Sequence, residues 1–268
     1  MIPKIKPPSL HSETAQPWGK PAGDPPPPPQ DNQPGPGSRR SLWSILFVVL
    51  LIATYGISAY QDISSPGSLS YWKDYFGSPS MTASAVTMTD GRKGLAIQGE
   101  IGPASASWFR EQLDAAKMTS GDVVFLSSPG GSLNQGLIMG AVVRSRGLTT
   151  VVGKVDSSGR PQPARCASAC VFVFAGGKVR EAMPRSLLGV HQFSTTGAKR
   201  EESASDIVSR TQRTTGIILD YMTEMGVSPS IMQAMTASKD IRWLTEQEAF
   251  DFNLVTARYA LPLPQAGR

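Results

Sequence analysis

Three short stretches of the chain carry residue types that together suit nucleophilic chemistry. Ser168 lies among small residues in Arg165-Cys166-Ala167-Ser168-Ala169-Cys170, directly before an apolar run. Ser128-Pro129-Gly130-Gly131 follows another apolar run, and His191 follows a third. A serine becomes a useful nucleophile only beside a general base. We therefore expect the three stretches to meet in one cleft and to form a hydrolase site.

His191 is the candidate for the general base. The sequence contains 2 histidines, and the other, His11, lies in the N-terminal tail. His191 also ends a predicted strand, where parallel α/β domains place functional groups. The competing interpretations are structural: a core histidine with satisfied hydrogen bonds, and a serine at position 168 that only caps a helix or fills space.

The Ser-Pro-Gly-Gly stretch suits an oxyanion hole. Glycines adopt positive φ and leave backbone N–H groups uncovered, and such groups near a helix N-terminus favour negative charge. Taken alone, the motif is more often a plain turn. Cys166 and Cys170, on either side of Ser168, either pair as a disulfide that stiffens the site or are two small buried apolar residues. Both interpretations stay open.

Composition divides the chain into parts. The proline-rich N-terminal tail has no apolar period, which predicts disorder on the cytoplasmic side. The next segment is apolar and uncharged, which predicts a single membrane-spanning signal-anchor helix. We expect a disordered tail over 1–40, the span over 41–61, a linker over 62–82, a folded α/β domain over 83–260 and a C-terminal tail over 261–268.

Charge predicts the topology and limits the partners. Arg39 and Arg40 precede the span, which favours a cytoplasmic N-terminus and a domain on the periplasmic or extracytoplasmic side of the inner membrane. A cleavable signal ending near Ile57-Ser58-Ala59 is the alternative, but the leading segment is long for one. The net charge of +5 is mild and no basic stripe is interleaved with aromatic residues, so nucleic acid is not expected. We expect no metal and no cofactor.

Apolar patterns alternate between short strands and longer helices, which predicts an α/β domain with mainly parallel pairing. Residues 167–175 fit a helix or a strand equally well, and 154–165 are expected to form a loop. The predicted strands are 83–89, 94–98, 122–126, 148–152, 186–190, 241–244 and 254–256. The predicted helices are 105–117, 133–146, 201–225, one that starts near Pro229, and a helical turn over 245–250. On the longest helix, the residues expected to face the core are Ile207, Ile217, Ile218, Met222 and Met225.

The order of these motifs resembles that of the ClpP-type serine proteases, within the wider ClpP/crotonase superfamily. The similarity extends from Leu95 to Thr256. It includes Gly99-Glu100-Ile101, the Ser-Pro-Gly-Gly stretch, Ala167-Ser168, His191-Gln192 and the segment from Trp243 to Ala249. The resemblance implies a ClpP/crotonase-like spiral of ββα units, peptide or protein substrates, and self-association into a homo-oligomer.

The resemblance also assigns roles. It makes Ser168 the nucleophile and His191 its base, and it places the oxyanion hole at the N–H groups of Gly130 or Gly131 and of Ala169. Asp240 is the candidate for the carboxylate that orients the histidine, although it is offset by one residue from the family position. Cys166 and Cys170 stand where the family has small residues.

The leading hypothesis is a membrane-anchored, exported serine hydrolase, specifically a ClpP-like peptidase. The offset of Asp240 motivates an alternative, a catalytically inactive peptide-binding or scaffolding module. Further alternatives are a signal-peptide-peptidase-like Ser–Lys enzyme that uses Lys178 or Lys199, a crotonase-like acyl-CoA enzyme, and a site with Cys170 as the nucleophile.

Overall fold

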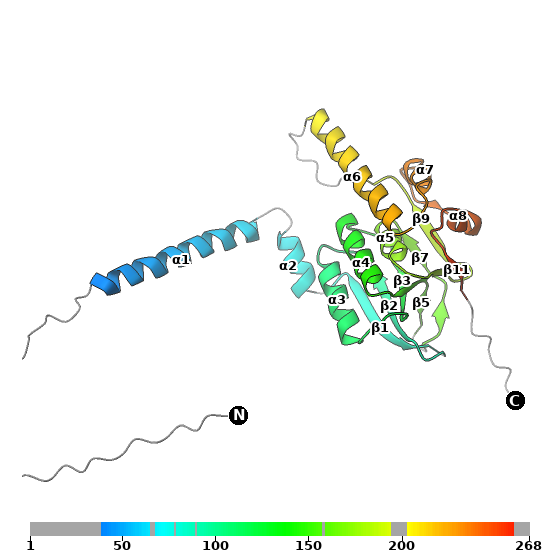
Figure 1. Ribbon diagram of the computed structural model, residues 1–268, viewed down its shortest axis with the longest axis horizontal. Coiled ribbons are helices and arrows are strands. Elements are labelled where there is room, and N and C mark those ends of the chain that lie inside the picture. Colours follow the sequence, from blue (N-terminus) through cyan, green and yellow to red (C-terminus); the bar gives the residue numbers. More distant parts are fainter. Residues whose placement is uncertain are drawn as a thin grey trace, which may run out of the picture. The chain divides into compact units, whose positions relative to one another are not determined.

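The computed structural model describes residues 39–64, 68–77, 79–88, 90–156, 159–193 and 203–259 (Figure 1). The chain divides into two compact units, 1–56 and 57–268. The predicted disordered tail, apart from Arg39 and Arg40, and the predicted C-terminal tail lie outside the described residues.

The N-terminal helix α1 covers Arg39–Ser64. Its stretch Leu42–Gln61 is long and apolar enough to cross a membrane, and it is the one such helix among the described residues. The apolar side chains of this stretch are exposed, as the hydrocarbon core of a bilayer would require.

The expected linker over 62–82 contains a helix, which corrects that prediction. Helix α2 (Ser68–Phe76) packs against α3 (Ser105–Ala115). The Asp74 carboxylate accepts hydrogen bonds from the backbone N–H groups of Ala104 (2.9 Å) and Ser80 (3.3 Å). The Tyr75 hydroxyl donates to Glu111 at 2.7 Å. These contacts make α2 a part of the folded domain.

The main sheet has six strands in the order β1-β2-β3-β4-β8-β11. β1 pairs antiparallel with β2, and the remaining pairs are parallel, so the domain is mixed α/β with mainly parallel pairing. Helix α3 connects β2 to β3, and α4 (Leu133–Ser145) connects β3 to β4. The strands are β1 (Met81–Thr87), β2 (Lys93–Gly99), β3 (Val123–Ser127), β4 (Thr149–Val152), β8 (Arg180–Ala182) and β11 (Ala257–Arg258).

A second, three-stranded sheet contains the strands that directly precede Ser168 and His191. β7 (Arg165–Ala167) pairs parallel with β9 (Leu187–Val190), and β9 pairs antiparallel with β10 (Arg242–Trp243). The segment over 167–175, which fitted helix and strand equally, forms helix α5 (Ala169–Ala175). Every residue of α5 is buried, which explains why it shows no helical period.

Several smaller predictions were wrong. The last strand is β11 rather than 254–256, because Leu254 and Val255 are buried in the core ahead of the strand. The loop over 154–165 contains a short hairpin of β5 (Lys154–Val155) and β6 (Pro161–Gln162). The remaining helices are α6 (Ala204–Glu224), α7 (Ile231–Thr236) and α8 (Glu246–Asp251).

Helix α6 is only partly buried. Ile218, Met222 and Met225 at its C-terminal end lie in the core, as expected. Ile207 and Ile217, also predicted to face the core, are exposed by 40% and 50%. Figure 1 shows that the N-terminal part of α6, which contains Ile207, projects beyond the sheet. Ile217 directly precedes the buried Ile218, so its side chain points in a different direction around the helix.

Close packing between α4 and α5 positions the start of α5. A Cβ at Gly136 of α4 would lie 2.6 Å from the carbonyl oxygen of Ala169, so only glycine permits this approach. At the far end of α5, the buried Arg180 guanidinium donates to the carbonyls of Ala175 and Gly177. Burial lowers the pKa of Arg180 to about 10, so it remains charged at neutral pH. The helix is thus held at both ends.

Candidate active site

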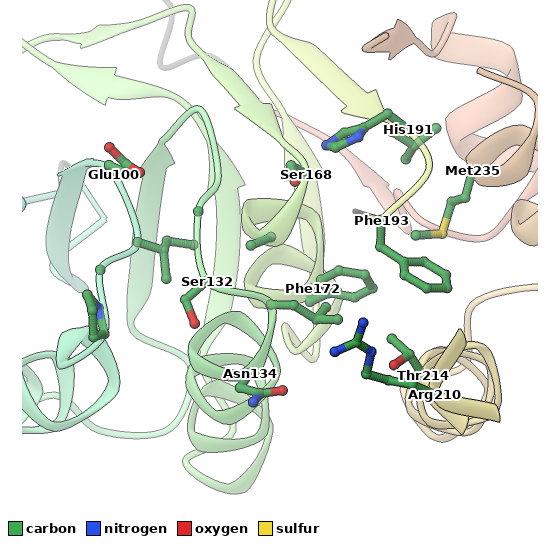
Figure 2. Close-up of a pocket in the computed structure, with 17 residues that line it drawn as sticks. Glu100, Ser132, Asn134, Ser168, Phe172, His191, Phe193, Arg210, Thr214 and Met235 are labelled. Carbon is green, nitrogen blue, oxygen red and sulfur yellow. The ribbon is translucent and has the colours of Figure 1, made fainter. Parts of the chain in front are cut away.

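A cavity of about 760 Å³ is lined by residues from all three stretches that the sequence singled out (Figure 2). The Ser-Pro-Gly-Gly stretch contributes to the lining through Gly131. Ser168 and Ala169 line it at the start of α5, Gly131 lines it beside them, and His191 lines it at the end of β9. The pairing of Ala167 with Gly189 in the β7–β9 ladder sets the relative positions of the serine and the histidine.

Ser168 occupies a sharp turn between β7 and α5. Its backbone has φ 55° and ψ −125°, a conformation that non-glycine residues rarely adopt. The backbone N–H of Ser168 donates to the Gly189 carbonyl at 2.9 Å, which fixes the turn. Although Ser168 is the N-cap of α5, its side chain makes no capping hydrogen bond. A strained, half-buried serine whose hydroxyl is not used for capping fits a functional role better than a structural one.

The glycine turn presses directly against this serine. Gly130 has φ 104° and Gly131 has φ 135°, which favour glycine at both positions. The Gly130 carbonyl accepts from the N–H of Ile101 at 2.7 Å, and the Ile101 carbonyl accepts from the N–H of Ser132 at 2.7 Å. These two bonds fix the orientation of the Gly130–Gly131 peptide.

The structure distinguishes between Gly130 and Gly131 as candidate hydrogen-bond donors to an oxyanion. The N–H of Gly130 donates to Ser128 Oγ at 3.0 Å, and Gly130 does not line the cavity. Within the described residues, the N–H groups of Gly131 and Ala169 have no hydrogen-bond acceptor, and both residues line the cavity. The candidate pair of donors is therefore Gly131 and Ala169, and the inclusion of Gly130 is corrected.

His191 lies half-buried at the same end of the cavity as Ser168 (Figure 2). No hydrogen bond joins their side chains within the described part of the chain. Gln192, the next residue, is tied to the segment before β10: its N–H donates to the Ser238 carbonyl at 2.8 Å, and its side-chain amide donates to the Thr236 carbonyl at 2.7 Å. These bonds hold the strand end that carries the imidazole.

Asp240 makes no hydrogen bond or ion pair with His191 in the part of the chain that the structure describes. The antiparallel ladder ends at the pair Arg242–Val190, and beyond it the N–H of Gln192 donates to the Ser238 carbonyl, so the ladder does not continue in the same register. The Asp240 side chain is exposed, and Asp240 does not line the cavity. Glu100 is the one carboxylate among the described residues that line the cavity, and it lies across the cavity from His191 (Figure 2).

Cys166 and Cys170 form a disulfide in the structure, with their Cα atoms 5.3 Å apart. One sulfur belongs to β7 and the other to α5, so the bond closes a small ring that contains Ser168. Both residues are buried. The bridge leaves Cys170 without a thiol, which removes it as a nucleophile in this state.

The lysine alternatives find no support in the geometry. Lys178 is exposed and does not line the cavity. Lys199 lies outside the described residues. Among the described residues that line the cavity, His191 is the group best suited to accept the serine proton.

Sequence reasoning missed part of the cavity. Phe172 of α5, Phe193 after β9, Met235 of α7, and Arg210 and Thr214 of α6 also line it. The one available signal was the spacing of Arg210 and Thr214, which places both on one face of α6. That spacing does not show which way the face points.

A solved structure similar to this chain is that of a ClpP1 mutant from Listeria monocytogenes. The two chains are 19% identical, and the similarity covers 63% of this chain and 92% of the other, with a TM-score of 0.46. No family model matches this chain. Because neither finding assigns an activity, the activity proposed for this chain rests on the geometry of its cavity.

Proposed function

We propose that the protein is a serine hydrolase, specifically a peptidase, with Ser168 as the nucleophile and His191 as the general base. One observation carries the proposal. The uncapped hydroxyl of the strained Ser168 shares a cavity with His191 and with the N–H groups of Gly131 and Ala169. Nucleophile, base and anion-binding donors are the parts that acyl transfer requires.

The proposed reaction follows from these positions. Ser168 Oγ attacks the carbonyl carbon of the substrate while His191 takes the hydroxyl proton. The N–H groups of Gly131 and Ala169 stabilise the oxygen that becomes negative. His191 then returns the proton to the leaving amine, and water releases the acyl group by the reverse sequence. The serine and histidine side chains must close to hydrogen-bond distance in the substrate complex, as is common for catalytic pairs.

The proposal includes a place in the cell. We place α1 in the inner membrane, with the N-terminus in the cytoplasm and the peptidase domain on the periplasmic or extracytoplasmic side, where it acts on peptides or proteins. A disulfide next to the nucleophile suits an oxidising compartment. Self-association into a homo-oligomer, which the resemblance implies, is part of the same proposal.

Labelling with a fluorophosphonate probe tests the hydrolase. The full chain in detergent is expected to become labelled, and peptide mapping is expected to place the label on Ser168. Ser168→Ala should abolish labelling, and His191→Ala should slow it by at least about a hundredfold. Ser132→Ala is a matched control, because Ser132 lines the same cavity but lies farther from His191 than Ser168 does (Figure 2). Labelling that survives Ser168→Ala would refute the assignment.

One observation favours a second candidate, a peptide-binding module without catalysis. Within the described residues, no carboxylate forms a hydrogen bond or an ion pair with His191, and the one carboxylate of the lining, Glu100, lies across the cavity (Figure 2). No described carboxylate therefore holds the ring in the orientation that a triad requires. This candidate predicts that wild-type protein binds peptides, is not labelled by the probe, and keeps its binding in Ser168→Ala.

A further inference from the structure

One side of helix α2 is fastened to the folded domain (Figure 1). Tyr71, Asp74 and Tyr75 lie on this side, at the three- and four-residue spacings that place side chains on one helix face. The Tyr71 hydroxyl and Ser107 Oγ of α3 share a hydrogen bond of 3.4 Å, and Asp74 and Tyr75 make the bonds described above. These contacts determine which side of α2 faces away from the domain.

The opposite side of α2 is apolar and exposed. Its apolar face consists of Leu69, Trp72 and Phe76, which are also three and four residues apart. Leu69 is exposed by 72%, Trp72 by 43% and Phe76 by 75%. The rings of Trp72 and Phe76 stack with their centroids 5.2 Å apart, so the face is one continuous surface. A continuous exposed apolar surface indicates a binding partner.

The charges of α2 favour a bilayer as that partner. Asp74 is the one acidic residue of the helix, and it is turned toward the amides of the domain. Lys73, the one basic residue, is exposed and lies beside the apolar face. A helix with Trp, Phe and Leu on one side and lysine next to them is typical of helices that lie in the interface of a bilayer containing anionic lipids.

The length of the connection to α1 keeps α2 close to the proposed membrane span. The apolar stretch of α1 ends at Gln61, and the helix continues to Ser64. The helical residues after Gln61 add about 4.5 Å, and the four peptide units from Ser64 to Ser68 span at most about 14 Å. Helix α2 therefore begins within about 19 Å of the end of the apolar stretch. Such a short tether gives even a weakly binding helix a high local concentration at the membrane surface.

We propose that the apolar face of α2 lies in the interfacial region of the bilayer and forms a second membrane contact after α1. The inference rests on the proposed function for the membrane anchor and is independent of the hydrolase. The contact holds one wall of the cavity near the lipid. Asp74 of α2 is bonded to the N–H of Ala104, and the two residues directly before Ala104, Gly102 and Pro103, line the cavity.

The test measures lipid contact at position 69 in the full chain, reconstituted in vesicles of phosphatidylcholine and phosphatidylglycerol. One added cysteine carries the fluorophore NBD, while the native Cys166 and Cys170 are buried in their disulfide and stay unlabelled. Nitroxide groups on the lipids should quench NBD at Leu69→Cys at least about threefold more strongly than NBD at Gln247→Cys, an exposed position on α8. Iodide in the water should quench the two positions in the reverse order.

Two variants in the Leu69→Cys background test the apolar and the charged part of the surface. Trp72→Ser/Phe76→Ser should lower lipid quenching at position 69 to the level of the Gln247→Cys control, and a melting curve shows whether this variant is folded. Lys73→Glu should lower the quenching in vesicles with phosphatidylglycerol and leave it nearly unchanged in vesicles of phosphatidylcholine alone, because only the anionic lipid attracts the lysine.

The outcomes distinguish this inference from the proposed anchor. If the chain does not float with the vesicles, the anchor and the lipid contact are both wrong. If it floats, but NBD at position 69 responds to both quenchers as the control position does, only the lipid contact is wrong. NBD at position 69 that neither quencher reaches would indicate a covering protein, such as a second copy of this chain, and would also overturn the lipid contact.

Discussion

Gly130 and Ser168 are packed so closely that they form one structural unit. A Cβ at position 130 would lie 2.6 Å from the Cβ of Ser168, 2.7 Å from the carbonyl oxygen of Ala167 and 3.0 Å from the N of Ala169. These are main-chain and Cβ atoms, which cannot rotate out of the way. Any side chain at position 130 must therefore displace either the serine or the glycine turn.

Gly130→Ala should consequently reduce the rate of probe labelling at Ser168 by about a hundredfold, because a displacement near 1 Å is costly to a nucleophile. Gly121→Ala is the matched control. Gly121 also has a positive φ of 88°, but no atom lies within 4 Å of its added Cβ. Equal loss of labelling in both variants would show that backbone strain, not the contact with Ser168, is responsible.

Asp240→Asn should have a small effect on labelling or peptide turnover, less than about tenfold. The reason is that its side chain is exposed and that it does not line the cavity. A carboxylate that orients the imidazole would instead cost about ten-thousandfold on removal. Steady-state rates of Asp240→Asn, measured together with those of His191→Ala, distinguish these two outcomes. A loss of about ten-thousandfold in Asp240→Asn would show that Asp240 belongs to the triad.

Removal of the disulfide should loosen the serine turn. For the double variant Cys166→Ala/Cys170→Ala, the free energy of unfolding is expected to fall by about 2 kcal/mol, from the entropy of the small loop that the bond closes. Labelling of Ser168 should slow by about tenfold, since the turn is then held only by its backbone bonds. Reductant should slow the labelling of the wild type and leave that of the double variant unchanged. An equal response in both proteins would show that the disulfide is not responsible.

Asp122 predicts how stability depends on pH. Burial alone would raise its pKa, but N–H groups of Thr119 and Lys93 and the Thr119 hydroxyl donate to it, so its pKa lies below the usual 3.8. Because the folded-state pKa is lowered, the stabilisation is complete above about pH 5 and is lost as pH falls through the folded-state pKa.

Asp122→Asn should therefore lower the free energy of unfolding by about 2 kcal/mol at neutral pH, from the lost charge-assisted hydrogen bonds. The difference from wild type should shrink below about pH 4. Denaturant titrations at several pH values measure it. Asp114→Asn, whose carboxylate is mostly exposed in its ion pair with Arg146, should change stability little. A difference between Asp122→Asn and wild type that stays constant down to about pH 2 would contradict this explanation.

Local sequence patterns predicted much of the domain. The apolar run of β3 and the periodic patterns of α3 and α4 are each set by residues that are close in sequence. The alternation of strands and helices was enough to predict mixed α/β architecture. The position of His191 at the end of a strand also followed from an apolar run that stops at that residue. The strand β7, which ends just before Ser168, was not predicted, because 154–165 was expected to be a loop.

What failed depends on contacts between distant residues. Helix α5 has no period because it is buried on all sides, and α2 is a helix of the domain only because α3 supplies partners for Asp74 and Tyr75. The N–H of Gly130 donates to Ser128 Oγ, a hydrogen bond that no sequence motif predicts. Arg210 could not be singled out, since nothing in a long helix states which of its faces closes a cavity.

Helix α2 has a practical consequence for work with the domain. A truncation that begins at β1, where the sequence pattern places the first strand, would remove Asp74, the acceptor for the amides that open α3 and precede β1. It would also remove the tyrosine side chains of α2 that bond to residues of α3. A water-soluble fragment should therefore start ahead of Ser68, and one that starts at Met81 should be harder to express and should melt at a lower temperature.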